Sequence, residues 1–218
     1  MKSFDKVFLT GCDANTEWML PWFIRNYMKY NKTPIIFANF GVSEEALNRI
    51  SPSCIGTIDC TNLPDKGWFK KPFAMIEAAR SAHKVCWLDT DCEVMGKLDD
   101  IFNYVEPNKL TLAEDKPWSK RRGETWHNSG VVAFQGRPPI LEQWAMDVRS
   151  NPTVGDQEVL HTILNQGLRR QIYISTLPSE YNWLRLMLQD GLDSNKKKIV
   201  HWTGPVGKQH IKGIIDGQ

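Results

Sequence analysis

The sequence lacks any hydrophobic run long enough to cross a membrane. Residues 1–6 also lack the apolar core of a signal peptide, so we expect no secretory leader. The five cysteines are odd in number and form no Cys-x-x-Cys pair, a pattern that indicates reduced thiols rather than a disulfide framework. Together these absences predict a soluble protein of the cytoplasm.

The chain also has little net charge, +2, whereas a broad nucleic-acid-binding surface needs clustered basic residues. Two local basic clusters, residues 120–122 and 196–198, are each either a solvated loop or a contact for an anionic substrate. No internal repeat, low-complexity tract or interdomain linker is present. The 218 residues, 41% hydrophobic and 24% charged, are ample for one core, so we expect residues 1–218 to form a single domain of unknown oligomeric state.

What the sequence does contain is an apolar run that ends in two carboxylates. Residues 84–88 have the composition of a buried strand, and Asp89 and Asp91 follow it directly. In open α/β sheets, ligands bind beyond the carboxyl ends of the strands, where two hard oxygen donors can hold a divalent cation. The motif alone is weak, because a chain with 14 aspartates contains about one Asp-x-Asp by chance, and a solvated acidic turn is the alternative.

Strand and helix patterns alternate along the first half of the chain. We expect strands at residues 6–10, 35–38 and 55–58, and helices at 17–30 (starting or kinking at Pro21), from Ser43 onward, and at 73–80. This alternation predicts an α/β fold with a mostly parallel central sheet flanked by helices.

The first strand is followed by a turn of small residues, an arrangement with which many α/β proteins bind a nucleotide. Thr10, Gly11 and Asp13 would then border the base or the ribose, although a tight turn without a ligand explains the pattern equally well. Lys71 begins a helix, a place that the helix dipole does not favour for a cation. A phosphate contact would explain Lys71, and an exposed lysine is the simpler alternative.

The second half of the chain adds further elements and candidate polar residues. We expect a short helical segment at 98–102, a strand at 110–113, a mobile polar loop at 117–124, a polar turn that feeds a buried strand within 126–134, helices at 138–149 and 156–164, a strand at 171–174, a loop at 177–183, and a strand at 198–201 followed by a Gly/Pro-rich loop. Asn128 and Ser129 either point into the cleft or serve the turn. Asp156 is either a site residue or a first-turn acid, and His201 is either a metal ligand or structural.

Five motifs occur in this chain in the same order as in the GT-A glycosyltransferases: a strand followed by Asp-x-Asp, then Asn-Ser-Gly-Val, Asp-Gln-x-x-Leu, Leu-Pro-x-x-Tyr-Asn and His-x-x-Gly. From Thr10 to Lys208 the sequence therefore resembles this group, above all the glycosyltransferase family 8 group of glycogenin and the bacterial lipopolysaccharide galactosyltransferases. The resemblance implies a GT-A, Rossmann-like fold. It also implies a hexosyltransferase that moves a hexose from a nucleotide sugar, usually UDP-linked, to a saccharide or other hydroxyl acceptor.

The same resemblance implies roles for individual residues. Asp89 and Asp91 match the metal- and ribose-binding pair and His201 the third metal ligand, the metal being Mn²⁺ or, as the alternative, Mg²⁺. Asp156 and Gln157 match the pair beside the anomeric carbon, where Gln157 would stabilise an oxocarbenium-like centre rather than act as a firm nucleophile. The expected donor-binding residues are Thr10, Gly11, Asp13, Lys71, Thr90, Asn128, Ser129, Gly204 and Lys208.

The sequence departs from the family pattern at several points. The family usually ends in His-x-x-Gly-x-x-Lys-Pro, whereas here Gly207 occupies the lysine position and Lys208 follows one residue later. His161 stands where the family often has Asn. The chain is also short, with no room for an elaborate acceptor domain. Retention of configuration rests on the analogy alone, because other Asp-x-Asp families invert.

Two other functions fit parts of the pattern. A phosphatase or phosphotransferase could use Asp89 as its nucleophile, but such enzymes typically carry Asp-x-Asp after the first strand, and here the motif follows several strands. A sugar- or nucleotide-binding module with a decayed site would have no need of Asp89, Asp91 and His201 together. The leading interpretation is a metal-dependent glycosyltransferase.

Overall fold

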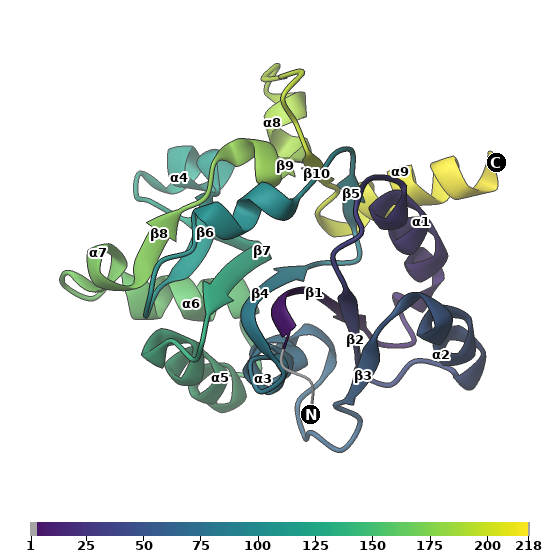
Figure 1. Ribbon diagram of the computed structural model, residues 1–218. Helices are drawn as coiled ribbons and strands as arrows, with labels where there is room; N and C mark the ends of the chain where they lie inside the picture. Colours follow the sequence, from purple (N-terminus) through teal and green to yellow (C-terminus); the bar gives the residue numbers. More distant parts are fainter. Residues whose placement is uncertain (1–3, 218) are drawn as a thin grey trace.

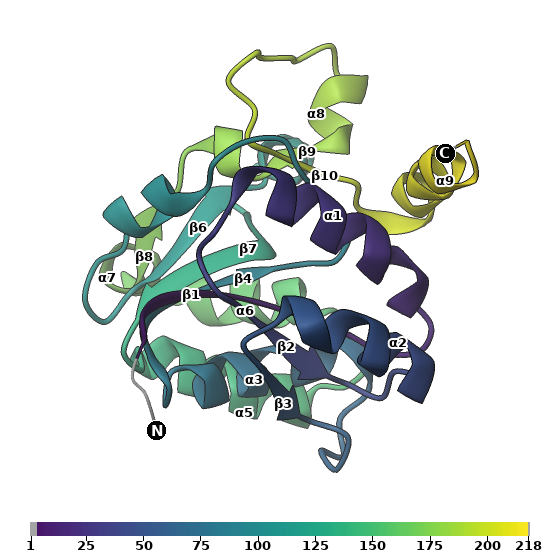
Figure 2. The ribbon, with the colours of Figure 1, turned by 45° about the vertical axis from the view of Figure 1, so that its right-hand side comes forward.

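A mixed sheet of seven strands forms the centre of the molecule and has helices on both faces (Figures 1 and 2). The computed structural model describes residues 4–217. The strand order is β3-β2-β1-β4-β7-β6-β8, and all neighbouring strands are parallel except those that pair with β7. The strands are β1 (Phe4–Cys12), β2 (Ile35–Asn39), β3 (Gly56–Asp59), β4 (Ala82–Leu88), β6 (Leu110–Glu114), β7 (His127–Gln135) and β8 (Ile174–Thr176). The prediction of a mostly parallel α/β sheet is confirmed.

Alternate residues of the central strands face opposite helix layers, as the two-residue period of a strand requires. Leu9 and Trp87 pack on one layer, whereas Phe8 and Leu88 pack on the other. Because both faces are covered, the central strands are nearly continuous apolar runs. The first layer contains α3 (Lys71–Ala78), α5 (Pro139–Ser150) and α6 (Asp156–Leu164), and the second contains α1 (Leu20–Tyr30) and α2 (Glu44–Ile50).

A second sheet of three strands includes β5, the strand that follows β4 in the chain. Its order is β5-β10-β9, and its strands are β5 (Cys92–Val94), β9 (Trp183–Leu184) and β10 (Ile199–His201). β10 runs antiparallel to β5, with His201 opposite Cys92. This pairing brings His201 of β10 next to the turn that carries Asp89 and Asp91.

The remaining elements surround the two sheets. They are the short 3₁₀ helices η1 (Glu17–Met19), η2 (Ser51–Ser53), η3 (Gly67–Lys70), η4 (Asp99–Asn103) and η5 (Ser179–Tyr181), and the helices α4 (Lys116–Arg122), α7 (Arg169–Tyr173), α8 (Arg185–Gln189) and α9 (Gly204–Asp216). Helix α8 and the chain that follows it project from the body of the protein (Figure 2). Within residues 4–217, no helix combines the length and apolarity that a membrane span requires. All five cysteines are free thiols.

The expected mobile loop at 117–124 is wrong, because residues 116–122 form α4. The side chain of Asp115 caps this helix by accepting a hydrogen bond from the backbone N–H of Trp118 at 3.1 Å. Pro117 lies in the first turn, and Gly123 ends the helix with a φ of 70°. The capping residue, the proline and the terminal glycine favour a helix here, although the polar composition suggested a loop.

Three further expectations about local structure are wrong. Residues 169–173 are helical and β8 begins only at Ile174; Ile172 is exposed, so the apolar alternation at 171–174 does not mark a buried strand face. Asn128 and Ser129 lie within β7, which begins at His127 because that residue pairs with Glu114 of β6. The loop expected after His201 becomes helix α9, whose first turn accommodates a proline.

Candidate active site

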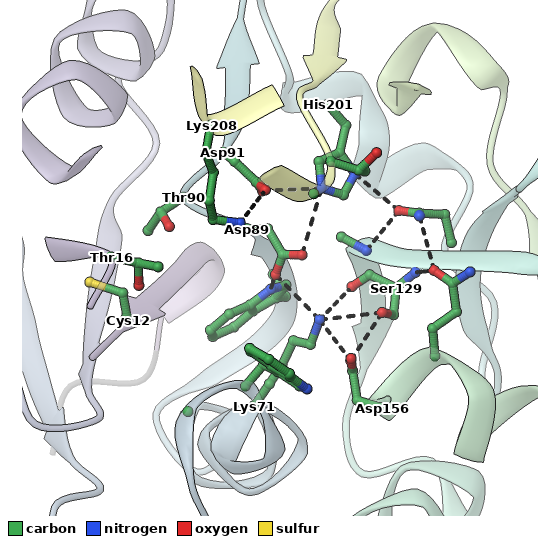
Figure 3. Close-up of a pocket in the computed structure, with 18 of the residues that line it drawn as sticks. Cys12, Thr16, Lys71, Asp89, Thr90, Asp91, Ser129, Asp156, His201 and Lys208 are labelled. Carbon is green, nitrogen blue, oxygen red and sulfur yellow. Dashed lines mark hydrogen bonds and ion pairs between the residues drawn. The ribbon is translucent and has the colours of Figure 1, made fainter. Parts of the chain in front are cut away.

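A cavity of about 350 Å³ opens where β1 and β4 end and β7 begins (Figure 3). Its lining includes every predicted site residue except Thr10. The hydroxyl of Thr10 donates to the backbone carbonyl of Leu88 at 2.8 Å, so this side chain ties β1 to β4 instead. The predicted residues that line the cavity are Gly11, Asp13, Lys71, Asp89, Thr90, Asp91, Asn128, Ser129, Asp156, Gln157, His201, Gly204 and Lys208.

The three predicted metal ligands meet at one side of the cavity. Nε2 of His201 lies 3.1 Å from Oδ1 of Asp91 and 3.8 Å from Oδ2 of Asp89. The thiol of Cys92 is also close to Asp91 and His201, but burial and the adjacent carboxylates raise its pKa well above the ordinary value. Thiolates select softer metals than Mn²⁺, whereas carboxylates suit Mn²⁺, so Asp89 is the better third ligand for that ion. Two carboxylates and one imidazole remain, a donor set that fits a divalent cation such as Mn²⁺.

Two buried amides fix the orientation of His201. Nδ1 of His201 lies 3.0 Å from Oδ1 of Asn182 and 3.1 Å from Oδ1 of Asn128. Both oxygens are acceptors, so Nδ1 carries a proton and Nε2 faces the carboxylates. The ring also needs the glycine at position 130, where a Cβ atom would lie only 2.0 Å from Cε1 of the imidazole. The amides select the tautomer, and Gly130 provides the space.

The acidic and basic groups at the metal side change one another's pKa values. Burial raises the pKa of Asp89, and the neighbouring carboxylate of Asp91 adds to the rise. Burial alone would also raise the pKa of Asp91, but the attraction of His201 outweighs it and the net pKa is lowered. For the same reason the pKa of His201 is raised, although its burial opposes this. Without a cation the imidazole thus acts as the counter-charge of Asp91; a metal would replace that proton.

Lys71 forms the centre of a second buried network (Figure 3). Its Nζ lies 2.8 Å from Oδ2 of Asp156 and 3.3 Å from Oδ1 of Asp89, and it donates to the carbonyl oxygen of Ser129 at 3.1 Å. Burial alone would lower the pKa of Lys71, but the carboxylates of Asp156 and Asp89 outweigh it and raise the pKa above the ordinary lysine value. Lys71 is therefore a buried cation that joins the metal side to α6, not an exposed lysine.

Gln157 is held by hydrogen bonds at both ends of its amide. Its Oε1 accepts from Nδ2 of Asn128 at 2.9 Å and from the backbone N–H of Ser129 at 3.3 Å. Its Nε2 donates to Oδ2 of Asp115 at 3.2 Å. Sequence reasoning missed Asp115, because it precedes the segment that we expected to be a loop. The amide group of Gln157 is fixed in position beside Asp156.

The end of β1 forms the opposite side of the cavity and is small and polar. A Cβ atom at Gly11 would lie 2.5 Å from the carbonyl oxygen of Ala38, so only glycine lets β1 lie this close to β2. The carboxylate of Asp13 accepts hydrogen bonds from the backbone N–H of Asn15 at 3.1 Å and from the hydroxyl of Thr16 at 3.2 Å. Trp68, which is exposed, borders this end.

The displaced lysine near the C-terminus still lines the cavity. A side chain at position 207 would place a Cβ atom 1.9 Å from the carbonyl oxygen of Trp202, so only glycine fits there. Nζ of Lys208 lies 3.5 Å from Oδ2 of Asp91. The shift of the lysine by one residue therefore does not remove it from the site.

Sequence reasoning missed several residues of the site. Trp118 lay within the expected loop at 117–124 and Asp115 just before it, and nothing in the sequence marked Trp68 as a lining residue. Asn182 was the last residue of the Leu-Pro-x-x-Tyr-Asn motif, which was a usable signal.

Comparison with known proteins gives matches in structure but not in sequence. No protein-family profile and no curated protein sequence matches this chain. The apo form of the glycosyltransferase GlyE from Streptococcus pneumoniae TIGR4 is similar, with a TM-score of 0.66, 19% identity, and coverage of 92% of this chain and 55% of GlyE. The galactosyltransferase LgtC, in complex with donor and acceptor sugar analogues, has a TM-score of 0.60 and 14% identity, with coverage of 97% of this chain and 95% of LgtC.

A third similar structure is a glycosyltransferase involved in glycosylation of the major capsid of PBCV-1. It has a TM-score of 0.64 and 14% identity, with coverage of 95% of this chain and 99% of that chain. The present chain thus spans about half the length of GlyE and nearly all of the other two proteins. Its fold is the GT-A glycosyltransferase fold, as the sequence motifs predicted.

Proposed function

We propose that the protein is a metal-dependent glycosyltransferase that moves a hexose from a UDP-sugar to a hydroxyl acceptor, with retention of configuration. The observation that carries the proposal is the convergence of Asp89, Asp91 and His201 in a cavity that also holds the Asp156–Gln157 pair. These residues come from distant parts of the chain. A GT-A fold with a decayed site would have no reason to keep all of them in contact.

The order of polar residues along the cavity suggests how the donor would lie. The β1 turn, with Gly11 and Asp13, offers a place for the nucleoside. Asp89, Asp91 and His201 would hold Mn²⁺, or alternatively Mg²⁺, beside the diphosphate. The hexose would then lie over the start of β7 and α6. In this pose the diphosphate would lie beside the cation, and the hexose beside Asp156 and Gln157.

A cation bound by the two carboxylates and the imidazole would act as a Lewis acid for the departing nucleoside diphosphate. Lys208 adds positive charge on the same side. Two hydrogen bonds hold the amide oxygen of Gln157, and with the donor bound in this way it would stabilise the positive charge that develops at the anomeric carbon. A leaving phosphate oxygen can take the proton of the acceptor hydroxyl, so no separate base is required.

The compartment is part of the proposal. The five free thiols, most of them buried, are compatible with a reducing environment such as the cytoplasm.

Thermal unfolding with UDP tests the metal site. UDP should raise the melting temperature much more with Mn²⁺ than with EDTA, because a ligand that binds only the folded state stabilises it. The variant Asp91→Asn should remove this metal-dependent difference and keep the fold. Equal shifts in Mn²⁺ and EDTA for the native protein would contradict the proposal.

A panel of UDP-sugars tests catalysis. With Mn²⁺ and no acceptor, the protein should slowly release UDP from one sugar in preference to the others, which would also identify the hexose. Metal-dependent binding of UDP without hydrolysis of any UDP-sugar would instead identify a binding module. Transfer of a phosphoryl group in place of a hexose, with Asp89 as nucleophile, would identify a phosphotransferase.

A further inference from the structure

The sheet order indicates which side of the cavity is left for the acceptor, given the proposed function. Along the edge of the sheet that carries the site, the strands follow the order β1, β4, β7 and β6. The proposed donor occupies the ends of β1, β4 and β7. The next position belongs to β6, which leads through Asp115 into α4. Trp118 of α4 lines the cavity at this end.

Helix α4 presents two arginines on the same face as Trp118. Residues three and four positions apart in a helix are neighbours, so Arg121 and Arg122 lie beside Trp118. The guanidinium carbon of Arg122 lies 4.9 Å from the centre of the Trp118 indole. Both arginines are exposed. An aromatic ring at the cavity is thus bordered by two cations that reach solvent.

The positive charge of α4 is not balanced by nearby acids. Its seven residues include four cations and no acid, and within residues 4–217 none of the four has a carboxylate within 4 Å. The flanking acids are used elsewhere: Asp115 bonds to Gln157 and Asn128, and Glu124 lies 3.2 Å from His161. Four other surface arginines, Arg49, Arg80, Arg137 and Arg149, are each paired with a carboxylate. Arg25 on α1 is exposed and, among the described residues, also has no carboxylate within 4 Å, but it stands alone and away from the cavity lining.

We propose that Arg121 and Arg122 form, with Trp118, a subsite for an anionic acceptor: a sugar that carries a phosphate or a carboxylate near the hydroxyl that is glycosylated. A guanidinium pairs well with either group because its N–H donors match two oxygens at once. The indole of Trp118, which packs against Arg122 and lines the cavity, adds apolar surface for the sugar. The hydrogen bonds of Asp115 to Gln157 and Asn128 tie the start of α4 to the catalytic side of the cavity.

Calorimetric titration tests the subsite on the native protein saturated with Mn²⁺ and UDP, which prevents turnover. The probes are glucose, glucose 6-phosphate and glucuronate. The two anionic sugars should bind at least about tenfold more tightly than glucose, and the better of the two identifies phosphate or carboxylate as the recognised group. The double variant R121Q/R122Q should lose this preference, whereas Arg25→Gln, which removes an exposed arginine on α1, should keep it.

Anionic sugars that bind no better than glucose, or that bind the double variant as well as the native protein, would overturn the proposal. The double variant should keep the full metal-dependent UDP shift, which shows that it is folded and has an intact donor site. Failure of the native protein to bind UDP with Mn²⁺ would count against the proposed function itself. The two failures are therefore distinguishable.

Discussion

The charged residues of the cavity floor (Lys71, His201 and the carboxylates beside them) are paired and largely buried, whereas the charged residues of helix α4 are exposed and, within residues 4–217, unpaired. On the floor, Lys71 is buried between two carboxylates, and His201 is buried against Asp91. On α4, four cations are exposed and have no carboxylate partner within the described residues. Both regions border the same cavity.

This difference predicts how a substitution in each region affects the stability of the fold and the preference for substrates. A buried charge must be paired, so the floor residues hold one another in fixed positions and the loss of one leaves another uncompensated. The charges on α4 are solvated, and their removal leaves nothing buried and unpaired. Stability and chemistry are therefore coupled on the floor but separate on α4. Substrate preference can change at α4 without risk to the fold.

The largest effect is expected from Lys71→Met. This change leaves the buried Asp156 and the half-buried Asp89 without their cation, which should lower the free energy of unfolding by about 3 kcal/mol and abolish UDP-sugar hydrolysis. Denaturant titration measures the first quantity. The matched control is Lys70→Met: Lys70 is also buried, but its Nζ donates only to carbonyl oxygens, so a loss of about 1 kcal/mol is expected. Equal losses would show that Lys71 is not held by its carboxylates.

An intermediate effect is expected from Asn182→Ala. The change removes an acceptor from Nδ1 of His201, so the imidazole is less firmly oriented and affinity for Mn²⁺ should fall about 10–100-fold. Metal titration followed by the UDP-dependent melting shift measures this. Asn31→Ala is the control, because Asn31 is equally buried but bonds to the backbone of Leu98 away from the site. It should destabilise the fold while metal affinity stays unchanged; a matching loss of affinity would contradict the role of Asn182.

The smallest effect on stability is expected from the double variant on α4. Arg121 and Arg122 are exposed, so R121Q/R122Q removes only the contact of Arg122 with Trp118 and two cations from the last turn of α4. The free energy of unfolding should fall by only about 1 kcal/mol. The same denaturant titration applies. Destabilisation comparable to that of Lys71→Met would contradict the conclusion that the charges on α4 contribute little to stability.

The sequence predicted the position of the site better than its internal contacts. The apolar run before Asp89 identified the central strand. The order of the motifs predicted that His201 lies close to Asp91, although the two residues are 110 positions apart. No helix or strand propensity could have shown that pairing, since it depends on β10 meeting β5. Lys71 was expected to face a phosphate or solvent, but it lies between two carboxylates, because a sequence shows charges and not which charges are adjacent.

Local misreadings had local causes. The basic composition of residues 117–124 suggested a loop, although Asp115 and Gly123 carry the start and stop signals of α4. At 171–174 the apolar residues suggested a strand, but Ile172 points to solvent. Asp115, which holds Gln157, could not be recognised at all, because one aspartate before a basic segment has no distinguishing pattern.

Gly130 has a consequence for how this site can change. A single methyl group at that position would occupy the same volume as the imidazole of His201, since a Cβ atom there would lie 2.0 Å from Cε1. Alanine, elsewhere the mildest replacement for glycine in a strand, would therefore expel the histidine from its place without altering any ligand. The position of His201 therefore requires that residue 130 has no side chain.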